Sequence, residues 1–462
     1  MDLISLHLME KDHKHFMFDK SMCMPVIISK RAYNIIDAIK KGMDKEQVYK
    51  DYGMDIVNHV LNRFSEIVEK NNDPETNTQD YEKAFHTISG YANEKISFIN
   101  LVLMVAQNCN ISCRYCYGGE SGSYNQKGLM SKQMAEKCFH YYLSNLGGNK
   151  KLNILFFGGE PLLNTDTIKH VIGLWEEYKH NYRDRTLTFS LVTNGILLTP
   201  ELVRYFKEKE VRITVSLDGP EDIHNANRVY KNGKGTFTEV MSSIEILRSC
   251  HMPFSVKVTT NRYTQYDQLT DFLCRQDFDA VYISQVDYPM LCTEKDYQMD
   301  TAMYGIYAKW QQELMQKGCH DMKEGKNNTF QAKQFNMANN SLRHNMKGFP
   351  FKCVAGWHIA SFGIDGRLYL CKSFVGQEAF CVGNADDGVD KEKLVRLYKD
   401  FLNASRDCDA CWALSVCERG CYYEKSKQDG GFAPIPQVIC NIYRDKYAAE
   451  MVNAAAFKYA KV

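Results

Sequence analysis

Three cysteines, Cys109, Cys113 and Cys116, stand close together just after a strand-like apolar run. Three residues separate the first two and two residues separate the last two, so all three thiols fall on one loop. A structural zinc site usually takes four protein ligands, often as paired cysteines, whereas cysteine thiolates hold iron–sulfur clusters. Three thiolates suit a four-iron cluster whose fourth iron stays open, and an open iron can bind a small ligand and pass it one electron.

A second series of cysteines begins after residue 350. Its members are Cys353, Cys371, Cys408, Cys411, Cys417, Cys421 and Cys440. The four from Cys408 to Cys421 are separated by two, five and three residues. The chain has 17 cysteines, and its first 20 residues carry too many charges for a secretory signal. Without a secretory context, metal ligands or reactive thiols are favoured over a disulfide framework, which is the alternative.

Length, composition and charge narrow the class of protein. A chain of 462 residues predicts roughly two or three domains, and 44% apolar residues suffice for their cores. The formal net charge of +1 gives no strong attraction to nucleic acid or anionic lipid. No apolar run approaches the roughly 20 residues that span a bilayer. We therefore expect a cytoplasmic protein with neither a nucleic-acid nor a membrane partner.

Between residues 98 and 300, apolar β-branched runs alternate with helical patterns. The predicted strands are Leu101–Gln107, Leu152–Phe157, Thr186–Thr193, Val211–Leu217, Phe254–Thr260 and Ala280–Val286. The helices predicted between them are Ser131–Leu146, Asp166–Tyr182, Pro200–Lys209, Phe237–Cys250 and Tyr266–Gln276. Such alternation predicts an α/β fold with a parallel sheet, built as a partial barrel or an open sheet. Functional groups should then gather at the carboxyl ends of the strands.

Polar or glycine-rich segments follow four of these six strands. The first is the three-cysteine loop, and the others are Gly158-Gly159-Glu160-Pro161, Thr193-Asn194-Gly195 and Ser216-Leu217-Asp218-Gly219-Pro220. Each of these three could be an ordinary turn. Their arrangement on successive strands favours a shared ligand pocket.

The flanking segments differ from this central pattern. Residues 1–75 predict a separate module with short strands followed by helices, and the polar, proline-containing segment 71–78 is a plausible boundary. The strands are expected at Leu3–Leu8, His15–Asp19 and Pro25–Ser29, and the helices at Lys30–Lys41, Lys45–Tyr52 and Asp55–Lys70. Residues 301–350 predict a polar, helical bridging segment, and residues 351–462 form the cysteine-rich region.

The three-cysteine spacing followed by the aromatic Tyr117 resembles the signature of the radical S-adenosylmethionine (SAM) enzymes. The resemblance implies a partial (β/α)6 barrel of the TIM type over residues 98–300, with Cys109, Cys113 and Cys116 ligating the catalytic cluster. In that family the free iron binds SAM, and one electron cleaves it to a 5′-deoxyadenosyl radical. Gly158, Gly159 and Glu160 would receive the methionine amino group, and Ser216 and Arg228 would bind its carboxylate. Further cofactor contacts are expected from Tyr117, Pro161, Asn194 and Asp218. An ordinary surface arginine is the alternative for Arg228.

The second cysteine series resembles the SPASM domain, which carries two auxiliary four-iron clusters, over about residues 351–445. The resemblance implies that the outer cluster is ligated by Cys408, Cys411, Cys417 and Cys440, and the inner one by Cys353, Cys371 and Cys421. The inner cluster is then one ligand short. Either Cys381 supplies it, or the open iron binds a substrate thiolate, as the similarity to maturases that make thioether bonds suggests.

The N-terminal module resembles the winged-helix-like element that captures a leader peptide as an added strand in many such maturases. A DNA-binding winged helix is the rival, but the predicted helices carry no excess of basic residues. Among the remaining cysteines, Cys23, Cys138, Cys250 and Cys274 are expected to be core residues, and Cys292 and Cys319 receive no role.

These resemblances imply a peptide maturase of the ranthipeptide or sactipeptide kind that uses SAM and three 4Fe–4S clusters. Its partners would be a cysteine-containing precursor peptide with a leader, and an electron donor such as flavodoxin or ferredoxin. The expected reaction joins a cysteine sulfur of the precursor to a carbon of another residue. The alternatives are a carbon–carbon crosslink, formylglycine formation in a sulfatase, or a non-catalytic zinc or redox protein.

Overall fold

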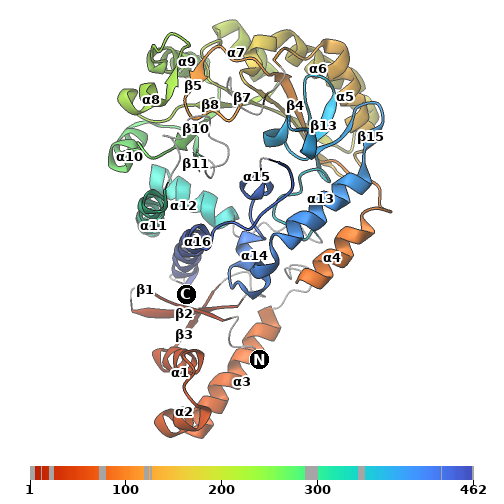
Figure 1. The fold of residues 1–462 in the computed structure, drawn as a ribbon. Coiled ribbons are helices and arrows are strands. Elements are labelled where there is room, and N and C mark those ends of the chain that lie inside the picture. Colours follow the sequence, from red (N-terminus) through yellow and green to blue (C-terminus); the bar gives the residue numbers. More distant parts are fainter. Residues whose placement is uncertain are drawn as a thin grey trace.

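The computed structural model describes residues 6–11, 13–19, 25–71, 80–118, 124, 127–286, 300–341, 349–427 and 429–459. A ten-stranded sheet forms its centre (Figure 1). Six of the strands run parallel in the order of the sequence: β4 (Asn100–Ala106), β6 (Lys151–Gly158), β7 (Thr186–Thr193), β8 (Arg212–Ser216), β10 (Phe254–Thr260) and β11 (Ala280–Gln285). All six overlap strands predicted from the sequence, so the α/β class with a parallel sheet is confirmed.

Helices connect these strands and cover the outer face of the sheet (Figure 1). They are α5 (Lys132–Ser144), α6 (Thr165–Tyr178), α7 (Pro200–Glu208), α9 (Phe237–Ser249) and α10 (Tyr266–Arg275). Local chemistry sets where they begin: the Thr199 hydroxyl accepts a hydrogen bond from the Leu202 N–H, and Pro200 fills the first turn of α7. Residues 101–106 of β4 are all buried, as expected for a parallel strand that is covered on both faces.

The sheet does not close into a barrel, because β11 is an edge strand. Helix α12 (Phe330–Ser341) covers this edge, and α11 (Thr301–Lys323) packs on α12. The buried Gln334 side chain donates from Nε2 to the Val281 carbonyl at 2.7 Å, and Lys333 donates to the Phe278 carbonyl at 2.8 Å. The bond to Val281 satisfies a carbonyl group of β11 that an uncovered edge strand would leave open to another chain.

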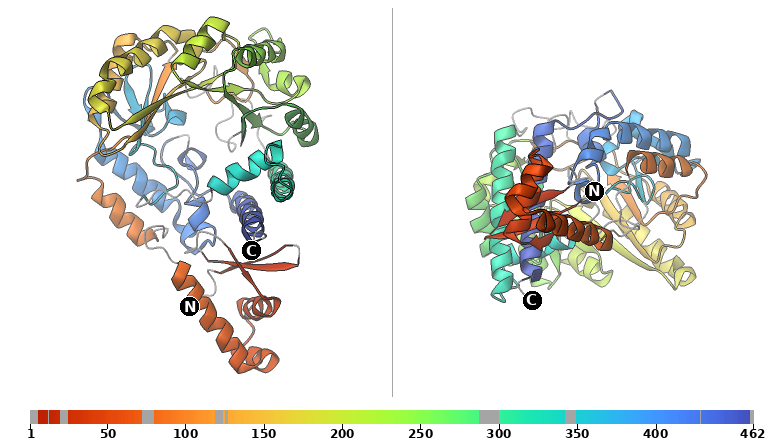
Figure 2. Two further views of the ribbon diagram at one scale, coloured as in Figure 1. Left: turned by 180° about the vertical axis from the view of Figure 1, so that it is seen from behind. Right: turned by 90° about the horizontal axis from the view of Figure 1, so that it is seen from below.

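The cysteine-rich region extends the same sheet, which the sequence did not indicate. Strand β12 (Ile359–Phe362) pairs in parallel with β4, and β13 (Arg367–Tyr369), β14 (Cys381–Asn384) and β15 (Gly388–Val389) continue in antiparallel pairs. Helices α4 (Tyr81–Gly90) and α13 (Lys391–Asn403) pack together beside it. The short helices α14 (Leu414–Cys417) and α15 (Tyr422–Lys425) follow, and α15 lies on the concave side of the sheet (Figures 1 and 2).

The N-terminal module has the predicted order of elements. An antiparallel sheet of β1 (His7–Lys11), β2 (Lys14–Phe18) and β3 (Val26–Ile28) precedes α1 (Lys30–Lys40), α2 (Lys45–Tyr52) and α3 (Met54–Asn71). The predicted strand Leu3–Leu8 lies only partly within the described residues. Cys23, Cys292 and most of the boundary segment 71–78 lie outside them. The module packs through Phe16, Phe18 and neighbouring apolar residues against α16 (Gln437–Lys458) and Trp412. In the described part of the chain, no helix combines the length and apolar character needed to cross a membrane.

Candidate active site

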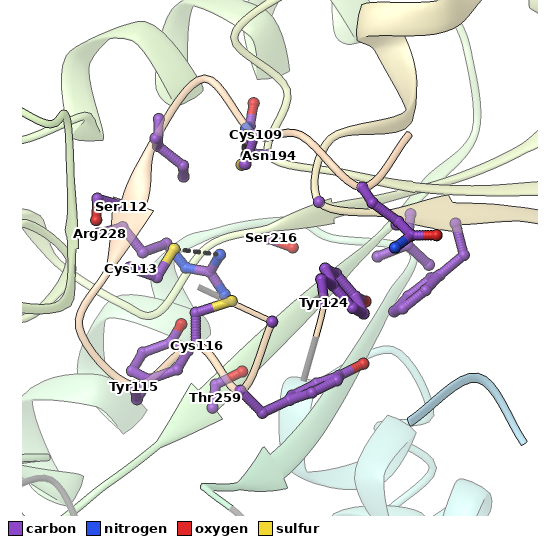
Figure 3. A pocket seen from close by; sticks show the side chains of 18 of the residues that line it. Cys109, Ser112, Cys113, Tyr115, Cys116, Tyr124, Asn194, Ser216, Arg228 and Thr259 are labelled. Atoms are coloured by element: carbon purple, nitrogen blue, oxygen red, sulfur yellow. Dashed lines mark hydrogen bonds between the residues drawn. The ribbon is translucent and has the colours of Figure 1, made fainter. Parts of the chain in front are cut away.

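A cavity of about 950 Å³ lies at the carboxyl ends of the parallel strands (Figure 3). Every one of the six strands contributes at or just past its end, through residues that include Gln107, Phe157, Thr193, Ser216, Thr259 and Gln285. The cysteine-rich region supplies another part of the wall through Lys372, Ser373, Cys421 and Tyr423. The cavity therefore lies between two regions that the sequence analysis treats as separate domains.

The three-cysteine loop lines this cavity with Cys109, Cys113 and Cys116 (Figure 3). Burial raises the pKa of the Cys109 thiol to about 11, and burial also raises the pKa of Cys113, with the other loop thiols adding to the shift. A thiol with a raised pKa is a weak nucleophile at neutral pH, and it becomes a thiolate when it coordinates a metal.

Two side chains from other strand ends reach these thiols. The Asn194 amide lies 3.9 Å from Cys109 Sγ, and Arg228 Nη1 lies 3.8 Å from Cys113 Sγ (Figure 3). A two-residue ladder fixes the second contact, because β5 (Ser112–Cys113) pairs with β9 (Arg228–Val229). N–H donors aimed at cysteine sulfur are among the features that tune an iron–sulfur cluster.

The Gly158-Gly159 pair allows the end of β6 to approach the three-cysteine loop closely. A Cβ on Gly158 would lie 1.9 Å from the Ala106 oxygen, and a Cβ on Gly159 would lie 2.3 Å from the Asn108 oxygen. The φ of Gly158 is 143°, which also favours glycine. The Gly159 N–H donates to Ala106 O at 2.8 Å, so this pair both lines the cavity and holds the loop against the sheet.

Glu160 and Pro161, predicted as cofactor contacts, lie behind the cavity wall. The fully buried Glu160 carboxylate accepts hydrogen bonds from the Thr193 hydroxyl at 2.7 Å and from the Asn194 N–H at 2.7 Å. Burial raises its pKa to about 7, although these hydrogen bonds act in the opposite direction. Pro161 begins a 3-10 helix. Glu160 thus ties the end of β6 to the end of β7.

Asp218 also lies behind the wall, where it anchors Arg228. Its carboxylate accepts from Arg228 Nε at 3.0 Å and Nη2 at 3.1 Å, from the Tyr115 hydroxyl at 2.6 Å, and from the Thr259 N–H at 3.0 Å. Both members of the ion pair are buried, so Arg228 is not an ordinary surface arginine. Of the predicted cofactor contacts, Tyr117, Gly158, Gly159, Asn194, Ser216 and Arg228 line the cavity.

Cys353, Cys371 and Cys421, called here the inner set, lie near one another on the cysteine-rich side. Cys421 is exposed because it faces the cavity. Burial within the surrounding protein, followed by the charges of Glu424, Cys371 and Cys353, holds the pKa of Cys421 well above its usual value. Cys381 instead donates a hydrogen bond from its thiol to the Gly383 carbonyl at 3.4 Å in β14.

The outer set of Cys408, Cys411, Cys417 and Cys440 surrounds a separate small cavity of about 90 Å³. Cations lie among these thiols: Lys425 Nζ is 3.9 Å from Cys408 Sγ, and Arg444 Nη1 is 3.7 Å from Cys411 Sγ. Four of the seven cysteines in the series therefore line this small cavity, and Cys421 lines the larger one.

The donor atoms at these sites are cysteine sulfurs, which are the ligands of iron–sulfur clusters. Among the residues that the structure describes, no three His, Cys, Asp or Glu side chains converge closely enough to hold one metal ion.

Sequence reasoning missed the cavity residues that no motif marks. Lys257 and Thr259 lie on β10, Ser284 on β11, and Lys372 and Tyr423 in the cysteine-rich region. Lys257 carried a usable signal, because a lysine in the middle of the apolar run Phe254–Thr260 needs a polar destination. Tyr423 carried none, because its place in the cavity depends on the fold of α15. Cys138 is buried, as predicted for a core residue, and Cys319, for which no role was predicted, is buried too. Cys274 is exposed, so the prediction that it is a core residue was wrong.

The comparison with protein families agrees with this geometry. Residues 103–271 match the model of the Radical SAM superfamily. The central part of the chain is therefore similar to the radical SAM superfamily, whose members use SAM and a 4Fe–4S cluster as cofactors. The matched segment contains the three-cysteine loop and the ends of β6, β7 and β8.

Several known proteins are similar over much of the chain. A cysteine-type anaerobic sulfatase-maturating enzyme of Clostridium novyi is 24% identical over 70% of this chain and 88% of its own length. The radical SAM cyclopropyl synthase TigE of Paramaledivibacter caminithermalis is 26% identical over 56% of this chain and 54% of its own length.

Two solved structures share the fold at lower identity. The structure of anSMEcpe with bound AdoMet and Cp18Cys peptide has a TM-score of 0.62, with 22% identity over 79% of this chain and 99% of that one. The structure of Streptococcus suis SuiB bound to precursor peptide SuiA has a TM-score of 0.52, with 14% identity over 94% of this chain and 98% of that one. The second likeness spans nearly the whole chain.

Proposed function

We propose that this chain is a radical SAM peptide maturase that forms thioether crosslinks in a ribosomally made precursor. One observation carries the proposal: a single cavity is lined by the three-cysteine loop and by Cys421 of the inner set. Cofactor chemistry and a second cluster would thus meet at one substrate space. The SuiB structure contains a precursor peptide and the anSMEcpe structure contains a peptide, which supports a peptide substrate here.

The inner set supports the thioether reaction in particular. Cys353, Cys371 and Cys421 interact with one another, whereas Cys381 bonds to the backbone of its own strand. Three ligands would leave one iron open, and Cys421 faces the cavity. A substrate cysteine could then be held as a thiolate beside the carbon to which it is joined.

The domain boundaries belong to the same proposal: residues 1–75 as a leader-binding module, 98–300 as the radical SAM core, 301–350 as a bridge and 351–462 as a SPASM domain with two clusters. When bound, SAM with its cluster supplies a deoxyadenosyl radical that can take a hydrogen atom. The residues of the chain line and shape the site: Arg228 and Asn194 contact the loop thiols, and Ser216 and Tyr423 line the cavity.

The edge strand β3 is the proposed site of the leader. The order of the module sheet is β1-β2-β3, and α16 with Trp412 covers the β1 side. Within the described residues β3 has no second neighbouring strand, and its Ile27 is 40% exposed. A leader added beside β3 would gain main-chain hydrogen bonds and a contact with Ile27. Ile27→Asp should weaken leader binding, whereas Met43→Asp, at a residue 42% exposed in the same module, should not.

Mass spectrometry tests the reaction. A cysteine-containing peptide encoded beside the gene is co-expressed anaerobically with the chain. Loss of two hydrogens for each event, with the cysteine then resistant to alkylation and to reducing agents, supports the thioether. Loss of two hydrogens with every thiol still alkylatable indicates a carbon–carbon crosslink. An unchanged peptide argues against the proposed substrate class.

Formylglycine formation in a sulfatase is the second candidate. It is favoured by the similarity to cysteine-type sulfatase-maturating enzymes over 70% of this chain. Incubation with a sulfatase-derived peptide distinguishes it, because a cysteine converted to formylglycine loses sulfur and gains a carbonyl that reacts with hydrazines. The thioether reaction retains the sulfur.

A further inference from the structure

The electrostatic surroundings of the three cysteine sets differ, and the difference concerns electron flow. Joining a C–H carbon to an S–H sulfur removes two hydrogens from the peptide. One leaves as a hydrogen atom to the deoxyadenosyl radical, the thiol proton goes to solvent, and one electron must pass to an acceptor. The following inference rests on the proposed function and asks what makes the outer set that acceptor.

Two cations reach the outer thiols without a carboxylate partner. Lys425 is buried, donates to the Ser405 hydroxyl at 2.7 Å, and lies 3.9 Å from Cys408 Sγ. Arg444 approaches Cys411 Sγ at 3.7 Å, and its other hydrogen bond goes to the neutral Asn441 side chain. Neither cation forms an ion pair with a carboxylate of the described residues.

A third cation, Arg419, completes the group but is compensated. Its side chain is fully buried and pairs with Asp409 at 2.8 Å. Arg419 also donates to the carbonyl of Ser405 at 3.2 Å, and Ser405 is the residue whose hydroxyl accepts the hydrogen bond from Lys425. Arg419 is therefore expected to fix the shape of the site more than its net charge.

The cation that approaches Cys113 of the three-cysteine loop is paired. Arg228 Nη1 lies 3.8 Å from Cys113 Sγ, and Arg228 forms an ion pair with the buried carboxylate of Asp218 at 3.0 Å. Asn194 and Asn110, which lie 3.9 Å from Cys109 Sγ, are uncharged. A cluster gains negative charge on reduction, so an uncompensated cation beside its thiolates favours the reduced form, and a neutralised one does so much less.

Helix α15 connects the two sets along the chain. Cys421 of the inner set immediately precedes the helix, and Lys425 lies 3.9 Å from Cys408 Sγ of the outer set. The carboxylate of the neighbouring Glu424 accepts a hydrogen bond from the Tyr443 hydroxyl at 3.0 Å, and Tyr443 also lines the outer cavity. The ammonium group of Lys425 at the outer set favours transfer of an electron outward.

We propose that Lys425 and Arg444 raise the reduction potential of an outer cluster, so that it accepts the electron released by the peptide and passes it to a one-electron carrier. Lys425 is the principal positioning residue, because it is buried where charge is screened least. Arg444, which is partly exposed, has the smaller effect.

An EPR-monitored redox titration tests the proposal. The full-length chain with Cys109, Cys113 and Cys116 replaced by Ala would retain only auxiliary clusters, which isolates their signals. Lys425→Gln should lower the midpoint potential of the outer cluster. At the midpoint potential of the parental chain, the ratio of reduced to oxidised outer cluster should fall about tenfold, which corresponds to a shift of about 59 mV for one electron. Arg444→Gln should give a smaller shift of the same sign. Lys427→Gln, at an exposed lysine two residues away, should give none.

The outcomes separate this inference from the proposed function. An unchanged or raised midpoint in Lys425→Gln, with iron content preserved, would overturn the inference alone. If Lys425→Gln loses iron, Lys425→Arg decides: a restored cluster with the parental midpoint supports a role for the charge, and continued loss of iron refutes it. If Cys440→Ala leaves both iron content and spectrum unchanged, no cluster occupies the outer set, and the three-cluster proposal fails with it.

Discussion

The buried Asp218–Arg228 pair should control the rigidity of the strand that carries Cys113. The change that tests this is Asp218→Asn, which keeps the size of the side chain but removes its charge. Asp218 accepts two hydrogen bonds from Arg228, and its side chain has no exposed surface. Removing one partner of a buried pair typically costs about 3–5 kcal/mol. Because Arg228 keeps its contact with Cys113, we expect a loss of stability at the lower end of this range, about 3 kcal/mol.

Hydrogen exchange measured by mass spectrometry is the appropriate assay, because it reports local opening and does not need the whole chain to unfold in one step. A loss of about 3 kcal/mol corresponds to roughly 100-fold faster exchange in peptides that cover β5 and β9. Arg228→Met should also accelerate exchange. The free energy of local opening lost in the double variant should be smaller than the sum of the losses in the two single variants, because the two side chains are coupled.

The control is Asp222→Asn, an exposed acid in α8 (Glu221–Asn227). It removes the same charge a few residues away and should leave exchange in β5 and β9 unchanged. Acceleration of less than tenfold in Asp218→Asn would refute the reasoning, because the pair would then contribute too little to hold the strand. Equal acceleration in both variants would show that net charge, and not the buried pair, is responsible.

Three further predictions concern other parts of the structure. Gly159→Ala would place a Cβ 2.3 Å from a backbone oxygen of the loop, so iron content should fall by about a third if three clusters bind. Gly173→Ala, with no atom within 4 Å of its Cβ, should retain iron. Burial lowers the pKa of His224 to about 4, so stability is intact above pH 6.5 and lost as pH falls towards 4. Between pH 6.5 and 5, the free energy of unfolding of the chain should fall by about 2 kcal/mol more than that of a His224→Gln variant, as measured by thermal unfolding. Phe18 is fully buried and meets Trp412 at 6.0 Å between ring centroids. Phe18→Ala should cost about 3–5 kcal/mol and make the N-terminal module more sensitive to limited proteolysis, whereas unchanged cleavage would contradict its docking role.

The sequence predicted the parallel strands because each is a short, buried, β-branched run bounded by turn residues. It also predicted where the chemistry gathers, since parallel strands present their carboxyl ends on one side of a sheet. The sequence does not indicate on which side of the cavity wall Asp218 and Glu160 lie. Both lie in motifs beside lining residues, and only the direction of each side chain decides whether it meets ligand or protein. Those directions follow from tertiary hydrogen bonds with Arg228 and Thr193, which have no local signature.

For a related reason, the sequence did not predict that the cysteine-rich region joins the central sheet. Strand β12 is only four residues long, and its partner β4 lies more than 250 positions earlier in the chain. Short apolar segments such as Ile359–Phe362 do not identify a partner strand by composition. Helix α4 was also missed, and it is stabilised by contacts with α13 such as that of Tyr81 with Asn403, which lie far away in sequence.

This shared sheet holds the three-cysteine loop and the cysteine-rich region in fixed positions relative to one another. The three-cysteine loop follows the carboxyl end of β4, and β12 pairs with the beginning of β4, where Ile359 lies opposite Asn100. Strand β13 pairs with β12 and ends at Tyr369, two residues before Cys371. The two regions are therefore joined by main-chain hydrogen bonds to a buried strand and not by a hinge. If the proposed reaction takes place in the cavity between them, the peptide would meet the loop and the inner set at a fixed spacing, without domain closure.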